Sequence, residues 1–266
     1  MQILVLSIFF VAFCEISSRA LAAMKQNKYD EPEFFAEYSQ MPRSIHGLAA
    51  GLEWTTFQAL LPDVRNKRVL DLGCGFGWHC RYAQEHGAQN VVGIDLSVKM
   101  LERAHASTHT AGIEYLRCAI EDIDFAANQF DVVISSLALH YVESFDRVCQ
   151  KVHHCLTPNG MFLFSVEHPI FTTLPTQSWY HGPNGERLYW PVDNYQEEGR
   201  RQTNCLTENV IKYHRTLATY VNTLIDSGFL LKRLEEPKPP SDTTDPDTHD
   251  QFRRPAFLVI AAINGQ

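Results

Sequence analysis

Short apolar segments alternate with amphipathic ones through the middle of the chain. Strands with buried-type centres are predicted at residues 67–71, 91–95, 113–118, 130–134 and 161–166. Between them apolar residues recur at helical spacing, as they do over residues 145–155. Strands that alternate with helices in this way predict a parallel sheet covered on both faces by right-handed crossovers. The pattern therefore predicts a doubly wound α/β domain.

The flanking segments follow other patterns. Apolar residues at helical spacing predict one helix over 44–61, which Pro62 would end. Residues from about 170 to 215 are rich in Pro, Gly, Trp and Tyr and predict an insertion, which forms either a lid over the site or a packed hairpin without contact to ligand. Its aromatic residues include Trp179, Tyr180, Tyr189, Trp190 and Tyr195. A helix at 217–226, closed by Gly228, and strands at 230–234 and 257–262 are expected to follow. We expect one domain over 24–266, with its core at 65–170.

The stretch after the first predicted strand is the most informative. Residues 71–77 place Gly73, Gly75 and Gly77 as G-x-G-x-G, whereas dinucleotide sites use G-x-G-x-x-G. Ligands of doubly wound sheets bind beyond the carboxyl ends of the strands. There Asp71 would repel a pyrophosphate but would suit an ammonium group, such as the one on the methionyl part of S-adenosylmethionine. The stretch therefore favours S-adenosylmethionine as the cofactor.

The second predicted strand ends in Asp95, whose carboxylate can accept two hydrogen bonds from a ribose diol. This feature fits NAD equally well. An NAD-dependent oxidoreductase is therefore one alternative function, and a protein that binds S-adenosylmethionine without turnover is another.

Four successive motifs resemble those of class I S-adenosylmethionine-dependent methyltransferases, above all the bacterial small-molecule type. They lie at residues 71–77, 92–97, 130–133 and 156–160. The resemblance covers about residues 65–170. It implies a Rossmann-like, seven-stranded, mostly parallel sheet whose last strand is antiparallel. It also implies that Gly73 and Gly75 line the methionyl part of the cofactor and that Asp95 holds the ribose.

The same resemblance places the adenine beside the segment that follows the third strand. Many relatives have Asp where this chain has Ala119, so the expected contacts are the backbone amide of Ile120 with Glu121 or Asp122 nearby. Ser135, at the end of the fourth strand, is also expected in the cofactor site.

Methyl transfer from a sulfonium is an in-line displacement, so positioning of the acceptor supplies most of the acceleration. A general base is needed only if the acceptor must lose a proton. His140 and His168 follow the fourth and fifth strands, and His214 precedes the helix at 217–226. These three are the candidate catalytic residues because imidazole titrates near neutrality. A structural hydrogen-bonding role is the alternative for each of them.

Composition bears mainly on the partners. The net charge is -8 and no basic cluster exceeds two residues, so a small-molecule acceptor is expected rather than a nucleic acid. The seven cysteines include no C-x-x-C pair, and neither His105 with His109 nor the run 153–155 has a third ligand at a recognisable spacing. We therefore expect free thiols, no metal and no membrane anchor in a monomer or homodimer.

The first 23 residues have two interpretations. An apolar run at 3–13 and the segment 20–22 resemble a secretory leader, but no Lys or Arg precedes the run. Alternatively, the start codon is assigned upstream and the protein begins at Met24. The second interpretation is favoured, since a secreted enzyme would have no supply of S-adenosylmethionine. It predicts a cytoplasmic protein; a secreted one is the alternative.

Overall fold

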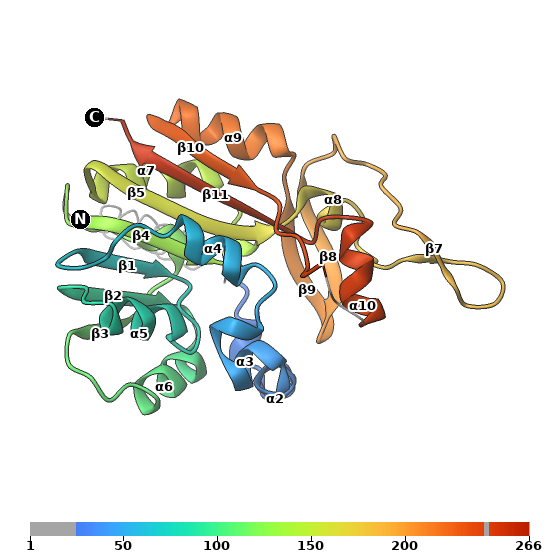
Figure 1. Cartoon of the computed structure of the whole chain (residues 1–266), viewed down its shortest axis with the longest axis horizontal. Helices are drawn as coiled ribbons and strands as arrows, with labels where there is room; N and C mark the ends of the chain where they lie inside the picture. Colours follow the sequence, from blue (N-terminus) through green and yellow to red (C-terminus); the bar gives the residue numbers. More distant parts are fainter. Residues whose placement is uncertain (1–24, 242–244, 266) are drawn as a thin grey trace, which may run out of the picture.

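A seven-stranded sheet forms the centre of the molecule (Figure 1) in the computed structural model, which describes residues 25–241 and 245–265. The strand order is β10-β11-β5-β4-β1-β2-β3. The strands are β1 (Arg68–Leu72), β2 (Asn90–Asp95), β3 (Ile113–Arg117), β4 (Phe130–Ser136), β5 (Leu156–Glu167), β10 (Phe229–Glu235) and β11 (Phe257–Asn264). β11 runs antiparallel to both of its neighbours, β5 and β10, while the other pairs are parallel. The predicted fold class is confirmed.

Alternation along the strands gives the sheet a separate core on each face. Leu70 of β1 packs into a cluster with α7 (Phe145–Cys155) and α9 (Leu217–Asp226). The preceding residue, Val69, packs into the opposite cluster, which α4 (Trp54–Leu60), α5 (Trp78–Glu85) and α6 (Val98–Ala106) cover. Both faces of the sheet are therefore covered by helices and buried, as is usual for a parallel sheet.

Strand β5 begins earlier than its apolar run predicts. Its partner residues jump from Phe130 opposite Leu156 to Val132 opposite Met161, so residues 157–160 loop out of the ladder. Asn159 has a positive φ of 62° there. The Pro-Asn-Gly segment that was expected to precede the strand is thus a bulge within it.

The single helix predicted over 44–61 is wrong. The chain instead forms α3 (Pro42–His46), η2 (Leu48–Ala50) and α4, after η1 (Lys28–Asp30) and α2 (Pro32–Gln40). Gly47 ends α3 with a φ of 72°, and a Cβ there would lie 2.9 Å from the Trp78 ring. Because this close approach needs a left-handed glycine, tertiary packing interrupts a segment whose spacing alone is helical.

The insertion contains α8 (Pro169–Thr172) and two hairpins: β6 (Tyr180–His181) with β7 (Arg187–Tyr189), and β8 (Gly199–Cys205) with β9 (Thr207–His214). The β6–β7 hairpin extends away from the sheet (Figure 1), and its Tyr180 and Tyr189 rings stack on each other. Short helices α10 (Pro246–His249) and η5 (Asp250–Phe252) lie between β10 and β11.

Several other predictions concern single features. Ser97 caps α6 by accepting a hydrogen bond from the Met100 amide, and Gly228 follows the end of α9 with a φ of 92°. The six cysteines of the described part of the chain are all free thiols. Between residues 25 and 265, leaving aside 242–244, none of the helices has the length and apolar character of a membrane span. The two interpretations of residues 1–23 lie outside the described residues.

Candidate functional site

A cleft of about 1080 Å³ lies beyond the carboxyl ends of the parallel strands. It lies at the switch point of the sheet, where β1 has β2 on one side and β4 on the other. Residues of α2 and α3 and of the β8–β9 hairpin also line it, so segments from both ends of the chain contribute to its walls. The aromatic side chains that the sequence suggested as a lid, Trp179, Tyr180, Tyr189, Trp190 and Tyr195, are not among the lining residues.

The glycine loop after β1 forms the floor of the cleft. Gly73 has a φ of 74°, and a Cβ there would lie only 2.5 Å from the Cβ of Ala138. Gly75 has a φ of 52°, and the nearest atom to its added Cβ would be the Tyr38 hydroxyl at 4.0 Å. The first glycine thus permits tight packing against the β4 loop, and the second leaves open space above the backbone for a ligand.

Asp95 at the end of β2 is held by two backbone amides. Its Oδ2 accepts a hydrogen bond of 2.9 Å from the Gly75 amide, and its Oδ1 accepts one of 2.9 Å from the Ser97 amide. Burial raises the pKa of this carboxyl to about 6. Asp95 lines the cleft, and each carboxylate oxygen can accept a second hydrogen bond. This geometry suits a ligand diol.

Asp71 and Ser135 lie behind the wall of the cleft. The Cys80 thiol donates to Oδ2 of Asp71 at 3.3 Å, and burial raises the pKa of the Asp71 carboxyl to about 7. The Ser135 hydroxyl donates to the carbonyl of Leu72 at 2.8 Å, whereas Ser136 lines the cleft. Alternation along β4 explains this difference between neighbours. The cofactor roles of Asp71 and Ser135 stay predictions.

The segment expected to read the adenine borders the Asp95 end of the cleft. Ile120 and Glu121 both line it and belong to η3 (Ile120–Asp122). Lys151 holds this turn from below by donating to the carbonyls of Glu121 and Ile123, both at 2.8 Å. These two hydrogen bonds connect the turn to α7.

The three candidate histidines have different surroundings. His140, in η4 (Leu139–Tyr141), lines the cleft, and its Nδ1 accepts a hydrogen bond of 3.4 Å from the Glu167 amide. Burial lowers the pKa of His140 to about 4, so its ring is neutral at pH 7. His168 and His214 are not among the lining residues.

Both nitrogens of the His168 and His214 rings are engaged by protein groups. In His168, Nε2 lies 2.9 Å from Glu236 Oε1, and Nδ1 accepts from the Ile170 amide at 3.1 Å. The His214 nitrogens lie 2.8 Å from the Thr172 hydroxyl and 2.9 Å from the Tyr195 carbonyl. The His214 contacts lie within the insertion, whereas those of His168 connect the end of β5 to Glu236 and to the start of the insertion. The catalytic roles of both residues stay predictions.

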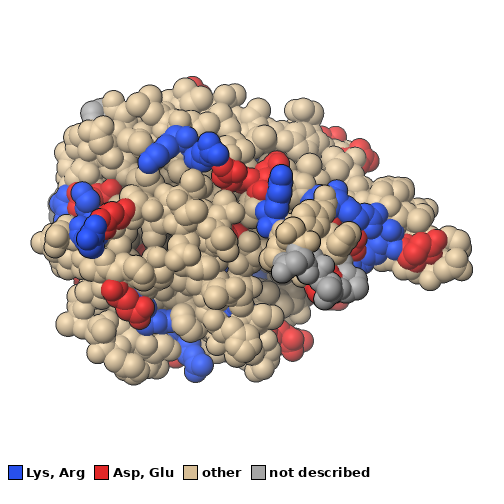
Figure 2. All heavy atoms as spheres, viewed as in Figure 1, with Lys and Arg blue, Asp and Glu red and all other residues tan. Residues whose placement is uncertain are grey.

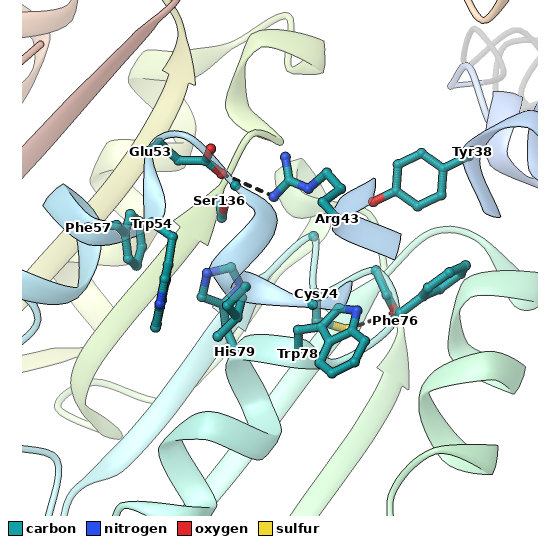
Figure 3. Close-up of a pocket in the computed structure, with 15 residues that line it drawn as sticks. Tyr38, Arg43, Glu53, Trp54, Phe57, Cys74, Phe76, Trp78, His79 and Ser136 are labelled. Atoms are coloured by element: carbon teal, nitrogen blue, oxygen red, sulfur yellow. Dashed lines mark hydrogen bonds and ion pairs between the residues drawn. The ribbon is translucent and has the colours of Figure 1, made fainter. Parts of the chain in front are cut away.

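An ion pair beside the glycine loop was not predicted from the sequence. Arg43 of α3 lies 3.1 Å from Glu53, and Figure 3 shows its side chain between Glu53 and the hydroxyl of Tyr38. All three residues line the cleft. The available signal was one arginine just before the segment 44–61 and one glutamate within it. Only the breaks at Gly47 and Gly51 bring them to the site.

A second missed pair lies at the β5 end. Glu167 lines the cleft, and its Oε1 lies 2.6 Å from Nζ of Lys212 on β9, which is 1% exposed. The Gln177 amide donates to the other carboxylate oxygen at 3.0 Å. Burial alone would raise the pKa of Glu167, but His140, Lys212 and Gln177 lower it, so this carboxylate is ionised.

Known proteins share this architecture. Residues 70–164 match the family described as methyltransferase domain. A protein of Listeria monocytogenes, proposed to be an S-adenosylmethionine-dependent methyltransferase, is 48% identical with a TM-score of 0.79, over 83% of this chain and 100% of that one. An S-adenosylmethionine-dependent methyltransferase of Mesorhizobium loti is 44% identical with a TM-score of 0.77, over 82% and 100%. An uncharacterized protein of Haemophilus influenzae is 34% identical over 90% of this chain and 97% of its own length.

Proposed function

Because this chain belongs to the family of class I S-adenosylmethionine-dependent methyltransferases, we propose that its methyl acceptor is a small molecule bound at the β5–β11 end of the cleft. One observation carries the proposal: a single cleft is lined by residues from Asp95 on β2 to Phe257 on β11. This path crosses four strand spacings, roughly 19 Å. Pockets for one small ligand have volumes of about 300–1,000 Å³, so a cleft of about 1080 Å³ suits a cofactor and a small acceptor together.

The residues at the Asp95 end fit S-adenosylmethionine. Its ribose diol would bind Asp95, and its adenine would lie beside Ile120 and Glu121. Its methionyl group carries one carboxylate and one ammonium, which match the guanidinium of Arg43 and the carboxylate of Glu53. Gly75 leaves room above the loop for this group. The Arg43–Glu53 pair therefore adds two cofactor residues to those expected from the sequence.

At the other end of the cleft, this chain's residues orient the acceptor. When bound, S-adenosylmethionine supplies a methyl group on a positively charged sulfur, which an acceptor lone pair displaces in line. His140 is neutral and lines the cleft, and because its Nδ1 accepts from the Glu167 amide, its ring proton is on Nε2 and can be donated to a lone pair of the acceptor. Glu167, kept ionised beside Lys212, stabilises the positive charge that moves toward the acceptor. His168 and His214, which do not line the cleft, would position the residues around it through their hydrogen bonds.

Surface charge also supports a small acceptor. The chain has a net charge of -8, and on the face in Figure 2 basic side chains lie beside acidic ones instead of forming one continuous basic patch. A nucleic-acid substrate would need such a patch to contact phosphates.

The test is an assay of S-adenosylhomocysteine release by the full-length protein. It compares pools of small acids, amines and phenols with total tRNA as acceptors. We expect release with one or more small-molecule pools and none with tRNA. Release with tRNA alone would overturn the proposal and would leave the methyltransferase family assignment intact.

A further inference from the structure

Arg254 lies at the β11 end of the cleft, in the short connection between η5 and β11. It lines the cleft together with Gln251 and Phe257 and is only 9% exposed. This end of the cleft borders Glu167, because Phe257 pairs with Glu167 across the β11–β5 ladder. Arg254 thus faces the region in which we place the acceptor.

Among the residues that the structure describes, the guanidinium of Arg254 forms no ion pair, and the acid whose charge reaches it, Asp250, is paired with Arg187 and Arg253. Its Nη1 donates to the Gln251 side-chain oxygen at 2.8 Å, and its Nε is buried without a hydrogen bond. Aromatic rings surround the rest: the guanidinium carbon lies 4.1 Å from the centre of the Trp190 ring and 4.8 Å from that of Phe171.

The adjacent Arg253 shows what a structural arginine in this connection looks like. It is exposed, forms an ion pair of 3.0 Å with Asp250, and donates to the carbonyls of Arg187 and Leu188. It is not among the residues that line the cleft. Arg253 therefore has a counterion in direct contact within the protein, whereas Arg254 does not.

Burying a cation that has no counterion in contact is costly, and the aromatic ring faces offset only part of that cost. Burial accordingly lowers the pKa of Arg254 to about 10, which still leaves it charged at pH 7. An anion that enters the cleft would supply the missing counterion. Its interaction would be strong because both groups would be shielded from water.

We propose that Arg254 is a specificity residue that binds an oxyanionic group, foremost a carboxylate, on the small-molecule acceptor. This inference rests on the proposed function and names the chemical class of its substrate. One guanidinium matches one carboxylate in charge and in its planar, two-pronged geometry. Glu167 lines the same end of the cleft, and its negative charge disfavours a phosphate dianion more than a carboxylate.

The experiment measures binding of benzoate, phenyl phosphate and neutral benzamide to the full-length protein in the presence of S-adenosylhomocysteine. Isothermal titration gives the affinity, and tryptophan fluorescence reports occupancy because Trp190 lies against Arg254. The variants are Arg254→Gln, Arg254→Lys and, as the matched control, Arg253→Gln. Benzoate is expected to bind the wild type and the control equally, and benzamide to bind neither.

In Arg254→Gln the affinity for benzoate should fall at least tenfold. Arg254→Lys retains the charge but loses the planar fork, so an intermediate loss is expected, and this variant serves if Arg254→Gln does not fold. Unchanged benzoate affinity in both variants, or no binding of either anion to the wild type, would overturn the proposal. Arg254-dependent binding of phenyl phosphate alone would keep the oxyanion site and assign it to a phosphorylated acceptor.

The acceptor assay separates this inference from the proposed function. If small molecules are methylated while benzoate affinity does not depend on Arg254, the proposed function stands and the specificity residue is wrong. If benzoate binding depends on Arg254 but only tRNA is methylated, the anion site is real and the proposed function is wrong.

Discussion

The carboxylate of Asp30 accepts a hydrogen bond of 2.6 Å from the hydroxyl of Ser97. It also accepts a hydrogen bond of 3.1 Å from the Lys99 amide, so Asp30 binds the first turn of α6. Ser97 is two residues beyond Asp95. Tyr29, which precedes Asp30 in η1, lines the cleft. The contact of Asp30 with Ser97 therefore connects the N-terminal wall of the cleft to the end of β2, where Asp95 is proposed to bind the ribose.

Removing the Asp30 carboxylate should loosen that wall. We expect Asp30→Ala to weaken binding of S-adenosylmethionine several-fold and to lower the free energy of unfolding by about 1 kcal/mol, as the loss of a helix cap does. A double-mutant cycle with Ser97→Ala, measured by urea unfolding, should give a coupling energy of at least about 0.5 kcal/mol. Strictly additive effects would show that the two side chains do not act together.

Asp95→Ala should weaken cofactor binding at least tenfold, about 1.4 kcal/mol, because the diol loses its acceptor and the Gly75 amide loses its partner. Isothermal titration with S-adenosylhomocysteine measures this change. Asp63→Ala is the control: Asp63 is exposed, pairs with Arg65 and precedes β1, at the opposite edge of the sheet. Equal affinity of a folded Asp95→Ala protein and the wild type would mean that the ribose contact is misassigned.

Asp71→Asn distinguishes a purely structural role of this buried carboxyl from one that also acts on the ammonium group of the cofactor. The pKa of Asp71 is raised to about 7 from 3.8, so the ligand-free protein loses stability as pH rises through this window. Asparagine does not ionise, so this loss is absent from the variant. Above pH 7 its free energy of unfolding should exceed that of the wild type by up to about 4 kcal/mol. Affinity for S-adenosylmethionine should fall at least tenfold if Asp71 acts on the ammonium group. Unfolding and titration at pH 5 and pH 8 test both effects, and unchanged affinity would restrict Asp71 to a structural role.

His140→Gln should impair methyl transfer while sparing cofactor affinity. The pKa of His140 is lowered from 6.5 to about 4, so the wild type loses stability as pH falls from 6.5 to 4, when the unfolded chain takes up the proton first. His140 accounts for a decrease of about 3 kcal/mol in the free energy of unfolding over this pH range. This part of the pH dependence should be absent from His140→Gln. Urea unfolding between pH 4 and pH 7.5 measures the difference. His168→Gln is the comparison for activity, and a larger loss of transfer there than in His140→Gln would reverse the assignment.

Much of the fold follows from local sequence patterns. The helix predicted at 145–155 coincides with α7, and the one at 217–226 coincides with α9. Asp95 could be placed in the site because it ends a strand, and the carboxyl ends of parallel strands share one edge of the sheet. The sequence by itself thus determined the doubly wound sheet, its glycine loop and the position of Asp95, because apolar periodicity acts over a few residues.

Only the tertiary structure decided which side chains reach the cleft. Arg43 reaches it because Gly47 packs against Trp78, and Lys212 meets Glu167 although 45 residues separate them. Ser136 lines the cleft where Ser135 does not, and His140 lines it where His168 and His214 do not. Arg254 is buried among rings that precede it in the chain by more than 60 residues. These placements depend on packing between distant segments, which a local pattern does not encode.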